Sequence, residues 1–440
     1  MSAWSSRRLH FVGLGGAGMS GLAIVAQALG ATVTGSDRAE SPYLVRVREA
    51  GIEPVIGHDA GNVPAGEDVE LVVSTAIAAE NPEREEGRRR GLTELHRGQL
   101  LGQVSAEKRT IAVAGAHGKT TTTSMIAHAL LGAGMDPSYL IGGALRTTGT
   151  NAAWGSGEWL VVEADESDRS FLNLHPEVAV VTNLELDHHT TYASTVDLEQ
   201  TFATFLGQSQ TAVLPPALRP LRGEGPIVEF TADAHGAPGG GTAFAWHGTE
   251  VTLAVPGEHN ARNAAAALEA CRLAGADEAR AIAALAEFRG AGRRFERLGQ
   301  TASGALVVDD YAHHPTEVGA TIAAARTLAP RRVVAVFQPH LFSRTKLLGR
   351  RFGAELAAAD VVVVLDVYPA RERAEDHPGV TGRLIAQAAA DTAPGRPVLW
   401  LPGFDDAEPV LRGLLRDGDI CLVMGAGDVD ALGRRLVADS

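Results

Sequence analysis

The sequence is poor in several residue types, and each shortage excludes a class of protein. Only two cysteines, Cys271 and Cys421, occur among 440 residues. Two distant thiols supply neither a metal-binding motif nor a disulfide framework, which fits a reducing compartment. Aromatic residues make up 5% of the chain, so stacking platforms for single-stranded nucleic acid are not expected. No apolar run approaches the roughly 20 residues that a membrane-spanning helix needs.

Positive charge is also scarce, because the formal net charge is −14 at pH 7. A charge of this sign repels the phosphate backbone of nucleic acids and the surface of anionic membranes. The N-terminal residues contain no hydrophobic signal region. We therefore expect a cytoplasmic protein that acts on small molecules, binds neither nucleic acid nor membrane, and is a monomer or a weak homodimer.

Lysine is rarer still. Of the 39 lysines and arginines, only residues 108, 119 and 346 are lysines. One of the three, Lys119, lies in the sequence A-G-A-H-G-K-T-T. A compact ammonium on a flexible stem enters a cramped phosphate site where a planar guanidinium does not. Lys119 therefore indicates a site for a nucleoside triphosphate.

Short β-branched runs alternate with alanine-rich helical stretches along most of the chain. This alternation predicts α/β domains with mostly parallel sheets, and the length suggests roughly three of them. We place the domains at residues 1–105, 106–289 and 290–440. We expect residues 83–97 to form a helix leading to a linker, and residues 215–243, rich in proline and glycine, to be the least ordered part of the second domain.

The segment from Gly115 to Thr120 follows an apolar strand and precedes a helix. It is shorter than the full Walker pattern, because Val113 stands where the first glycine is expected. Its small residues still let backbone N–H groups converge on phosphate oxygens at a helix N-terminus. Lys119 would reach the β- and γ-phosphates, and the Thr120 hydroxyl would bind Mg²⁺. A capped turn without a ligand is the alternative.

Acidic residues follow the next two strands. The sequence E-A-D-E-S-D places four acids within residues 163–168, and T-N-L-E-L-D-H-H places Asn183, Asp187 and His188 after the following strand. Ligands of α/β sheets bind beyond the carboxyl ends of the strands, so these groups would lie beside the triphosphate. Because hard oxygen ligands suit Mg²⁺, we predict a second divalent ion here; a solvated acidic loop is the alternative.

The first domain contains G-L-G-G-A-G between a strand and a helix, with glycines at 13, 15 and 18. Asp37 ends the next strand, where a ribose-binding acid would stand. The pattern predicts a diphosphate at a helix N-terminus, and it leaves open whether the ligand is NAD or a UDP-sugar. A second glycine turn, G-A-G at 425–427, favours a plain strand-to-helix turn over a dinucleotide site.

Two further pairs of polar residues lie close to predicted helices. Asn260 and Asn263 lie at i and i+3 of a helix start, where they could read an adenine edge or cap the helix. Arg293 and Arg294 follow a helix at the start of the third domain, where they could clamp anionic oxygens. Neither pair identifies a ligand by itself.

Taken together, these motifs resemble those of the Mur ligases of peptidoglycan synthesis. The matching strings, in chain order, are H-F-V-G-L-G-G-A-G-M-S-G, A-G-A-H-G-K-T-T-T, E-A-D-E-S-D, T-N-L-E-L-D-H, G-E-H-N-A-R-N, G-R-R-F and D-D-Y-A-H-H-P-T-E. The resemblance covers essentially the whole chain. It implies an N-terminal Rossmann-like domain that binds a UDP-sugar, a central P-loop ATPase with a mostly parallel sheet, and a C-terminal Rossmann-like domain that admits an amino acid.

The resemblance also implies roles for individual residues. Those implied for the UDP-sugar are Gly13, Gly15, Gly16, Gly18, Ser36 and Asp37. Those implied for ATP are Gly115, Ala116, His117, Gly118, Lys119, Thr120, Thr121, Asn260, Asn263 and Asp310. The implied metal ligands are Thr120, Glu163 and His188, the amino-acid contacts are His340 and Arg344, and the catalytic groups are Lys119, His188, Arg293 and Arg294. Many members have arginine where this chain has Leu341, so Arg344 would carry more of the amino acid's carboxylate.

The reaction implied by the resemblance is an ATP-dependent ligation with Mg²⁺. The lactyl carboxylate of UDP-N-acetylmuramate would become an acyl phosphate and would then be attacked by the amine of L-alanine. Three alternatives remain open. They are a sister ligase that adds a preformed tripeptide to the same sugar, an NAD-dependent oxidoreductase that uses Gly13–Gly18, and a nucleotide switch that needs neither sugar nor amino acid.

Overall fold

The computed structural model describes residues 3–187 and 191–438, which form two compact units. The first unit comprises Met1–Ala232 and Arg262–Arg289, and the second comprises Asp233–Ala261 and Gly290–Ser440. The described residues form four sheets, of which the three larger are mostly parallel. The predicted α/β class is therefore confirmed. Within the described ranges, no helix is both long enough and apolar enough to cross a membrane.

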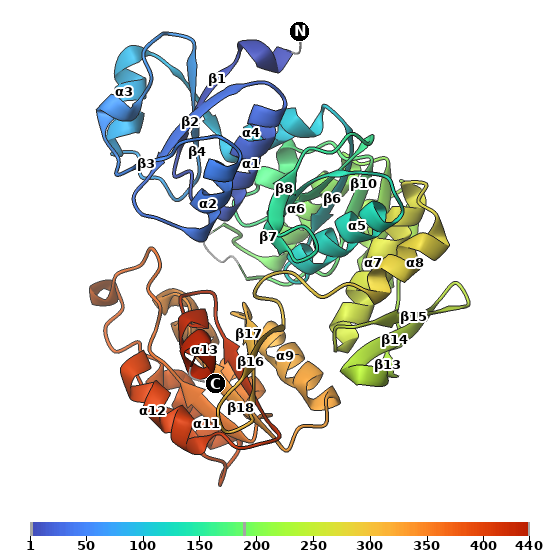
Figure 1. Cartoon of the computed structure of the whole chain (residues 1–440), viewed down its shortest axis with the longest axis vertical. Helices are drawn as coiled ribbons and strands as arrows, with labels where there is room; N and C mark the ends of the chain where they lie inside the picture. Colours follow the sequence, from blue (N-terminus) through green and yellow to red (C-terminus); the bar gives the residue numbers. More distant parts are fainter. Residues whose placement is uncertain (1–2, 188–190, 439–440) are drawn as a thin grey trace. The chain divides into compact units, whose positions relative to one another are not determined.

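The first unit begins with a five-stranded, fully parallel sheet of order β3-β2-β1-β4-β5. Its strands are β1 (Arg8–Val12), β2 (Thr32–Asp37), β3 (Val55–Ile56), β4 (Val69–Val73) and β5 (Thr93–His96). Its helices are α1 (Ala17–Ala28), α2 (Pro42–Glu49), α3 (Pro82–Arg90) and α4 (Arg97–Ser105). Strands β1, β2 and β4 lie side by side in Figure 1. The central strand β1 is buried over four of its five residues, as expected for a sheet covered on both faces.

One prediction for this sheet was only partly confirmed. Residues 83–97 were expected to form a helix leading to a linker, but α3 ends at Arg90, where Gly91 caps it with φ +70°. The strand β5 follows and pairs with β4, and Arg97 then begins α4. The short strand T-E-L-H is half exposed at the sheet edge, so its sequence lacks the apolar run that marks the buried strands.

The seven-stranded sheet of the first unit has the order β12-β11-β10-β6-β9-β7-β8, and only β8 is antiparallel to its neighbour. Its strands are β6 (Arg109–Ala114), β7 (Ser138–Leu145), β8 (Thr150–Ala153), β9 (Trp159–Glu163), β10 (Val178–Val181), β11 (Thr211–Leu214) and β12 (Ile227–Glu229). The helices are α5 (Lys119–Gly132), α6 (Thr195–Gly207), α7 (Glu258–Leu273) and α8 (Glu278–Ala286). Helix α7 starts in the second unit and continues into the first.

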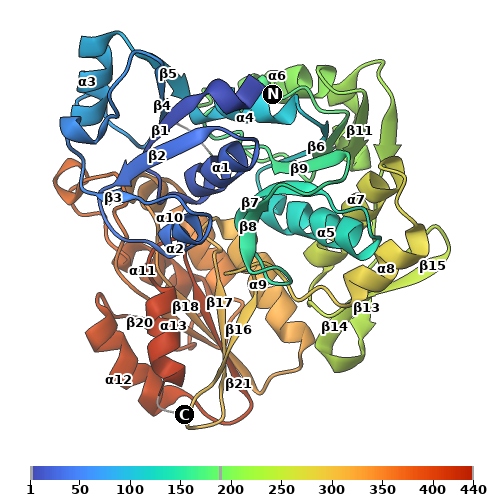
Figure 2. The same cartoon turned by 45° about the horizontal axis from the view of Figure 1, so that its top comes forward.

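The two sheets of the first unit are joined through α1. Figure 2 shows this helix beside β7 and β8. The side chain of Asn151 in β8 donates to the carbonyl oxygen of Ala17 at 2.9 Å. A Cβ on Gly21 would lie 3.1 Å from Cβ of Ala152, so the helix approaches the strands closely. The start of α1 is thereby fixed against the second sheet.

The second unit contains a six-stranded sheet of order β16-β17-β21-β18-β19-β20, in which only β16 is antiparallel. Its strands are β16 (Glu296–Gln300), β17 (Leu306–Asp310), β18 (Arg332–Phe337), β19 (Val361–Val364), β20 (Val398–Trp400) and β21 (Asp419–Met424). Alternate residues of β18 point to opposite faces. Val333 and Phe337 join the core under α9 (Pro315–Thr327), α10 (Phe342–Leu356) and α11 (Arg383–Thr392). Val334 joins the core under α12 (Phe404–Leu414) and α13 (Asp430–Val437).

The stretch 215–243, expected to be the least ordered part of the second domain, contains regular structure. Its first half supplies β12 to the seven-stranded sheet. Its second half contains β13 (His235–Ala237) and the start of β14 (Gly241–Trp246), which form a small antiparallel sheet with β15 (Thr249–Leu253). The strands are three to six residues long, so the proline and glycine turns between them dominate the composition.

Candidate active site

Two glycines with positive φ shape the loop between β6 and α5. Gly115 has φ +133°, and Gly118, which precedes α5 as its N-cap, has φ +82°. A Cβ on Gly118 would lie 2.6 Å from Oδ1 of Asn263. Because both residues are glycine, the loop adopts this conformation without a steric penalty. Lys119 and Thr120 then occupy the first two positions of the helix.

Lys119 folds back over its own loop. Its Nζ donates to the carbonyl oxygen of Gly115 at 2.7 Å and to Oε1 of Glu166 at 2.9 Å. Burial disfavours the ammonium form, but the carboxylates of Glu166, Asp165 and Glu163 outweigh that effect and raise the pKa of Lys119. Lys119 is therefore a fixed positive charge at the start of α5.

Oxygen atoms suited to a metal ion converge beside this lysine. The Thr120 hydroxyl donates to Oε1 of Glu163 at 3.1 Å, and the backbone N–H of Gly142 donates to Oε2 at 2.8 Å. Hydroxyl and carboxylate oxygens are the hard ligands that Mg²⁺ prefers, so Thr120 and Glu163 fit a magnesium site. The third predicted ligand, His188, lies outside the described residues.

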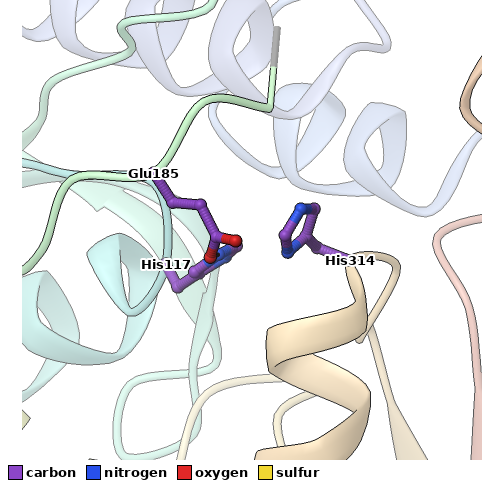
Figure 3. A group of neighbouring side chains, drawn as sticks. All are labelled: His117, Glu185 and His314. Carbon is purple, nitrogen blue, oxygen red and sulfur yellow. Dashed lines mark hydrogen bonds and ion pairs between the residues drawn. The ribbon is translucent and has the colours of Figure 1, made fainter. Parts of the chain in front are cut away.

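The segment after β10 holds the other side of the loop. The Thr182 hydroxyl donates to the carbonyl oxygen of His117 at 2.6 Å, and Oδ1 of Asn183 accepts the His117 N–H at 2.9 Å. The side chains of His117 and Glu185 meet with 3.0 Å between Nε2 and Oε2 (Figure 3). Figure 3 also draws His314, the N-cap residue of α9 in the second unit. Asn183 therefore positions the loop, and its expected place near the metal stays a prediction.

The remaining residues expected to bind ATP in the first unit lie beside this loop. The carbonyl oxygen of Ala116 is 3.4 Å from Nζ of Lys119. Thr121 is a buried residue in the first turn of α5. Asn263 is buried and its amide lies against Gly118. All three therefore share the surroundings of the lysine.

Groups of β2 hold the glycine loop that follows β1. The N–H groups of Gly13 and Leu14 donate to the carbonyl oxygen of Ser36 at 2.9 and 2.8 Å. The N–H of Gly15 donates to Oδ2 of Asp37 at 2.7 Å. Asp37, expected as a ligand contact, therefore also orders the loop that was predicted to bind a diphosphate.

A buried carboxylate that the sequence analysis missed supports the same loop. Both oxygens of Glu83 in α3 accept the Ser36 hydroxyl at 2.7 Å, and Asn62 donates to Oε1 at 2.9 Å. Ring nitrogens of His10 and His58 each lie 3.1 Å from the carboxylate. Burial would raise the pKa of Glu83, but the hydrogen bonds from His10, Ser36, Asn62 and His58 outweigh it and lower the pKa to about 2.

A cavity of about 350 Å³ lies between the two sheets of the first unit. Gly16 and Gly18 at the start of α1 line it, as do Glu163 and Asp165 at the end of β9 and beyond. Arg97, which was expected to end a helix before a linker, lines the same cavity. The cavity therefore connects the glycine loop predicted for a diphosphate with the carboxylates predicted for a metal.

The two adjacent arginines of the second unit have different surroundings. Arg293 donates to Oδ2 of Asp309 at 3.2 Å, and to the carbonyl oxygens of Gly425 and Gly427 at 2.7 and 2.8 Å. It thereby fixes the G-A-G turn between β21 and α13. These contacts use three of the five N–H donors of Arg293. The expected clamp of Arg293 and Arg294 on phosphate oxygens stays a prediction.

Arg294 lies between Arg293 and Phe295, which have φ values of +57° and +49°. Asp310 holds this turn, because Oδ2 accepts the N–H of Phe295 and Oδ1 accepts the N–H of Ala312, both at 2.8 Å. Burial raises the pKa of Asp310. Asp310, expected as a nucleotide contact, is therefore also the residue that positions Arg294.

The two residues predicted for the amino acid lie together in the second unit. Nη1 of Arg344 is 3.5 Å from Nδ1 of His340, and the His340 ring stacks on Tyr368 with centroids 5.9 Å apart. Burial, together with the positive charges of His313 and Arg344, lowers the pKa of His340 to about 3. His340 is therefore neutral at pH 7, and Arg344 supplies the charge.

Leu341, where many Mur ligases have arginine, occupies the N-cap position of α10 with φ +71°. Such a backbone conformation costs on the order of 1–3 kcal/mol in a residue other than glycine. The N–H of Leu341 donates to the carbonyl oxygen of Tyr368 at 3.0 Å, and its carbonyl oxygen accepts the Thr345 hydroxyl at 2.8 Å. These hydrogen bonds hold the residue beside His340 in its strained conformation.

Asn260 lies in the second unit, at the start of α7. Its side chain donates to the carbonyl oxygen of Pro256 at 2.7 Å, and the residue is buried. This contact lies within the helix start, which fits the alternative that Asn260 caps the helix. A contact between Asn260 and adenine stays a prediction.

Three family models match the chain in succession. They are "Mur ligase family, catalytic domain" at residues 8–109, "Mur ligase middle domain" at 113–215, and "Mur ligase, glutamate ligase domain" at 293–427. The fold and these matches define the class of protein, a ligase of three α/β domains. The chain belongs to the Mur ligase family.

Curated relatives are similar to the chain over almost its whole length. The UDP-N-acetylmuramate–L-alanine ligase of Rubrobacter xylanophilus is 43% identical, with 98% of this chain and 99% of the relative covered. The enzyme of the same name from Acidithiobacillus ferrooxidans is 44% identical, with 97% and 96% covered.

Solved structures show the same architecture. The UDP-N-acetylmuramate-alanine ligase MurC of Thermotoga maritima is 28% identical with a TM-score of 0.84, and 98% of each chain is covered. A murein peptide ligase of Psychrobacter arcticus is 26% identical with a TM-score of 0.72, also over 98% of each chain. The predicted three-domain α/β architecture is therefore confirmed.

Proposed function

We propose that this protein joins L-alanine to the lactyl carboxylate of UDP-N-acetylmuramate in peptidoglycan precursor synthesis. ATP is converted to ADP and phosphate, and the product is UDP-N-acetylmuramoyl-L-alanine. Two relatives named for this ligation are 43–44% identical over nearly the whole chain. The observation that carries the proposal is the cavity, because it joins the glycine loop at Gly18 to Glu163, beside Lys119 and Thr120.

The reaction has two steps. A carboxylate oxygen of the sugar attacks the γ-phosphorus of ATP, which gives an acyl phosphate and ADP. The alanine amine then attacks the acyl carbon, loses a proton, and releases inorganic phosphate. Phosphoryl transfer of this kind needs positioning and charge neutralisation more than covalent help from the protein.

Lys119 would neutralise the charge that develops on the transferred phosphoryl group, because Glu166 and the Gly115 carbonyl hold its ammonium in the loop. Thr120 and Glu163 would hold Mg²⁺, which lowers the negative charge on the phosphates when it is bound. His188 stays a proposed third ligand. The remaining residues proposed to contact ATP are Gly115, Ala116, His117, Gly118, Thr121, Asn260, Asn263 and Asp310.

The remaining proposed contacts divide between the two other substrates. For the UDP-sugar they are Gly13, Gly15, Gly16, Gly18, Ser36 and Asp37. His340 and Arg344 would hold alanine, with Arg344 on its carboxylate, and Arg293 and Arg294 would bind the phosphates. We propose that residues 1–105, 106–289 and 290–440 serve the sugar, ATP and amino acid in turn, in a cytoplasmic monomer or weak homodimer.

The test is a reaction with the full-length protein, ATP, Mg²⁺, UDP-N-acetylmuramate and alanine. We expect phosphate release that needs both the sugar and the amino acid, and a product with the mass of the alanylated sugar. Phosphate release without those substrates would favour the nucleotide switch. Faster reaction with the preformed tripeptide than with alanine would favour the sister ligase, and nicotinamide binding would favour the oxidoreductase.

A further inference from the structure

The position of Arg97 follows from the order of strands in the five-stranded sheet. Arg97 begins α4 directly after β5, and β4 lies between β5 and β1. The ends of these three parallel strands lead into Arg97, residues 74–76 and the glycine loop at 13–18, all of which contribute to the wall of the cavity. This edge of a parallel sheet is where α/β proteins bind ligands.

Only part of the Arg97 guanidinium is used by the protein. Nη2 lies 2.6 Å from Oδ2 of Asp165 and 3.3 Å from Oδ2 of Asp168. Over residues 3–187 and 191–438, Nη1 and Nε have no hydrogen-bond partner. A guanidinium has five N–H donors, so three of them are available to a ligand. A Cβ on Gly18 would lie 3.3 Å from Nη1, which places these donors beside the start of α1.

The charges around the cavity show which ligand these donors suit. Glu163 and Asp165 line it, and of the described residues that form its wall, Arg97 alone is cationic. An anionic ligand needs this charge to offset the carboxylates. The N-cap of α1 is Gly16, and no side chain caps the helix, so its first N–H groups and its positive dipole end supply further donors. Adjacent phosphates match a planar fork next to a helix N-terminus.

We propose that Arg97 binds the diphosphate of the UDP-sugar through Nη1 and Nε, while Asp165 and Asp168 hold Nη2 and so fix the orientation of the side chain. The inference rests on the proposed function, because that function supplies a ligand with a diphosphate. If Arg97 served only to neutralise the acidic loop, its loss would disturb the ATP side, where Glu166 of the same loop pairs with Lys119.

Isothermal titration of the full-length protein with UDP, UDP-N-acetylglucosamine, UDP-N-acetylmuramate and ATP tests this assignment. Arg97→Met removes the charge and the fork, and Arg97→Lys keeps only the charge. Arg109→Met is the matched control, because Arg109 lies at the start of β6, at the opposite end of this strand from the loop at 115–120, and pairs with Glu177 at 2.6 Å. Thermal melting of each variant reports on folding.

We expect Arg97→Met to weaken binding of all three uridine ligands by about 10- to 100-fold, as for loss of hydrogen bonds to a charged group. Arg97→Lys should lie between Arg97→Met and the unmodified protein, and ATP binding should change less than about twofold. Unchanged affinity for the uridine ligands, or an equal loss of ATP affinity, would overturn the assignment. A loss confined to UDP-N-acetylmuramate would also overturn it, because the guanidinium would then contact the lactyl carboxylate.

Ligand binding by the unmodified protein distinguishes a failure of this inference from a failure of the proposed function. If it binds none of the three uridine ligands, the proposed function fails and Arg97 has no diphosphate to bind. If it binds them and the Arg97 variants bind them equally well, the proposed function stands and the role of Arg97 is refuted. A melting temperature of Arg97→Met far below that of Arg97→Lys would make Arg97→Lys the deciding variant.

Discussion

The two glycine loops of the first unit occupy equivalent places after β1 and β6, but they obtain their positive charge differently. The loop at 115–120 carries its own cation, Lys119, at the first position of α5. The loop at 13–18 contains no cation, and Arg97 reaches it from the end of another strand. A loop that contains its own lysine can be recognised from sequence as a candidate phosphate site. A loop whose cation comes from a residue distant in the chain cannot be recognised in this way.

The loops also differ in what supports them. The loop at 13–18 is held by the carbonyl oxygen of Ser36, and the Ser36 hydroxyl donates to the buried carboxylate of Glu83. The second is held by the polar side chains of Thr182 and Asn183 after β10. Glu83 is fully buried, so its charge contributes to stability as well as to loop geometry. The loops should therefore respond differently to substitution and to pH.

The largest effect is expected from Lys119→Ala, which removes the internal cation. Loss of one key electrostatic donor lowers the rate by on the order of 10³-fold. Phosphate release in the presence of all substrates measures it, and Lys346→Ala, at an exposed lysine of α10, is the control. Near-normal turnover by Lys119→Ala would show that the reaction does not depend on a cation inside the loop at 115–120.

Glu83→Gln should remove a component of stability that depends on pH. The folded-state pKa of Glu83 is lowered from 4.5 to about 2, so the stabilisation is complete above pH 4.5 and is lost as the pH falls toward 2. The shift corresponds to on the order of 3 kcal/mol. We expect the melting temperatures of Glu83→Gln and the unmodified protein to differ most above pH 5 and to converge as the pH falls toward 2. A difference independent of pH would contradict the role of the charge.

Gly118→Ala should weaken ATP binding in the second loop. A residue with a Cβ at φ +82° costs roughly 1–2 kcal/mol, and this Cβ would lie 2.6 Å from Oδ1 of Asn263. We expect the KM for ATP to rise by about 10-fold or more, with little change in the KM for the UDP-sugar. Gly207→Ala in α6, where a Cβ meets nothing within 4 Å, controls for the substitution itself. An equal rise in both KM values would mean that the two loops are not independent.

Gly18→Ala in the first loop should have the smallest effect. Gly18 has no positive φ, and its Cβ would meet only Nη1 of Arg97, at 3.3 Å. We expect the KM for the UDP-sugar to rise by about two- to fivefold, as for a shift of one side chain worth less than about 1 kcal/mol. In an Arg97→Met background the effect should vanish, because the two substitutions act on one contact. Simple additivity would contradict the contact.

The rarity of lysine did not by itself identify the phosphate-binding residue. Lys108 is equally rare, yet its Nζ donates to the carbonyl oxygens of Gly155 and Gly157 at 2.5 and 2.6 Å and lies over the ring of Trp154. It fixes a loop, and burial lowers the pKa of Lys108 although the carboxylate of Asp136 acts in the opposite direction. The strand, glycine loop and helix around Lys119 separate the two lysines in the sequence, because a phosphate site needs that geometry as well as the charge.

The buried strands that lead into the two glycine loops, the loops themselves and the family were predictable from sequence, because buried strands, glycine turns and helix starts depend on neighbouring residues. Their residue patterns are therefore contiguous in the chain. Tertiary structure decided three features: the contact of Glu83 with Ser36, the contact of Asp310 with the turn at Arg294, and the position of Arg97 at the cavity. Each depends on which strands become neighbours, and strand order brings together residues whose separation in the chain carries no local signal.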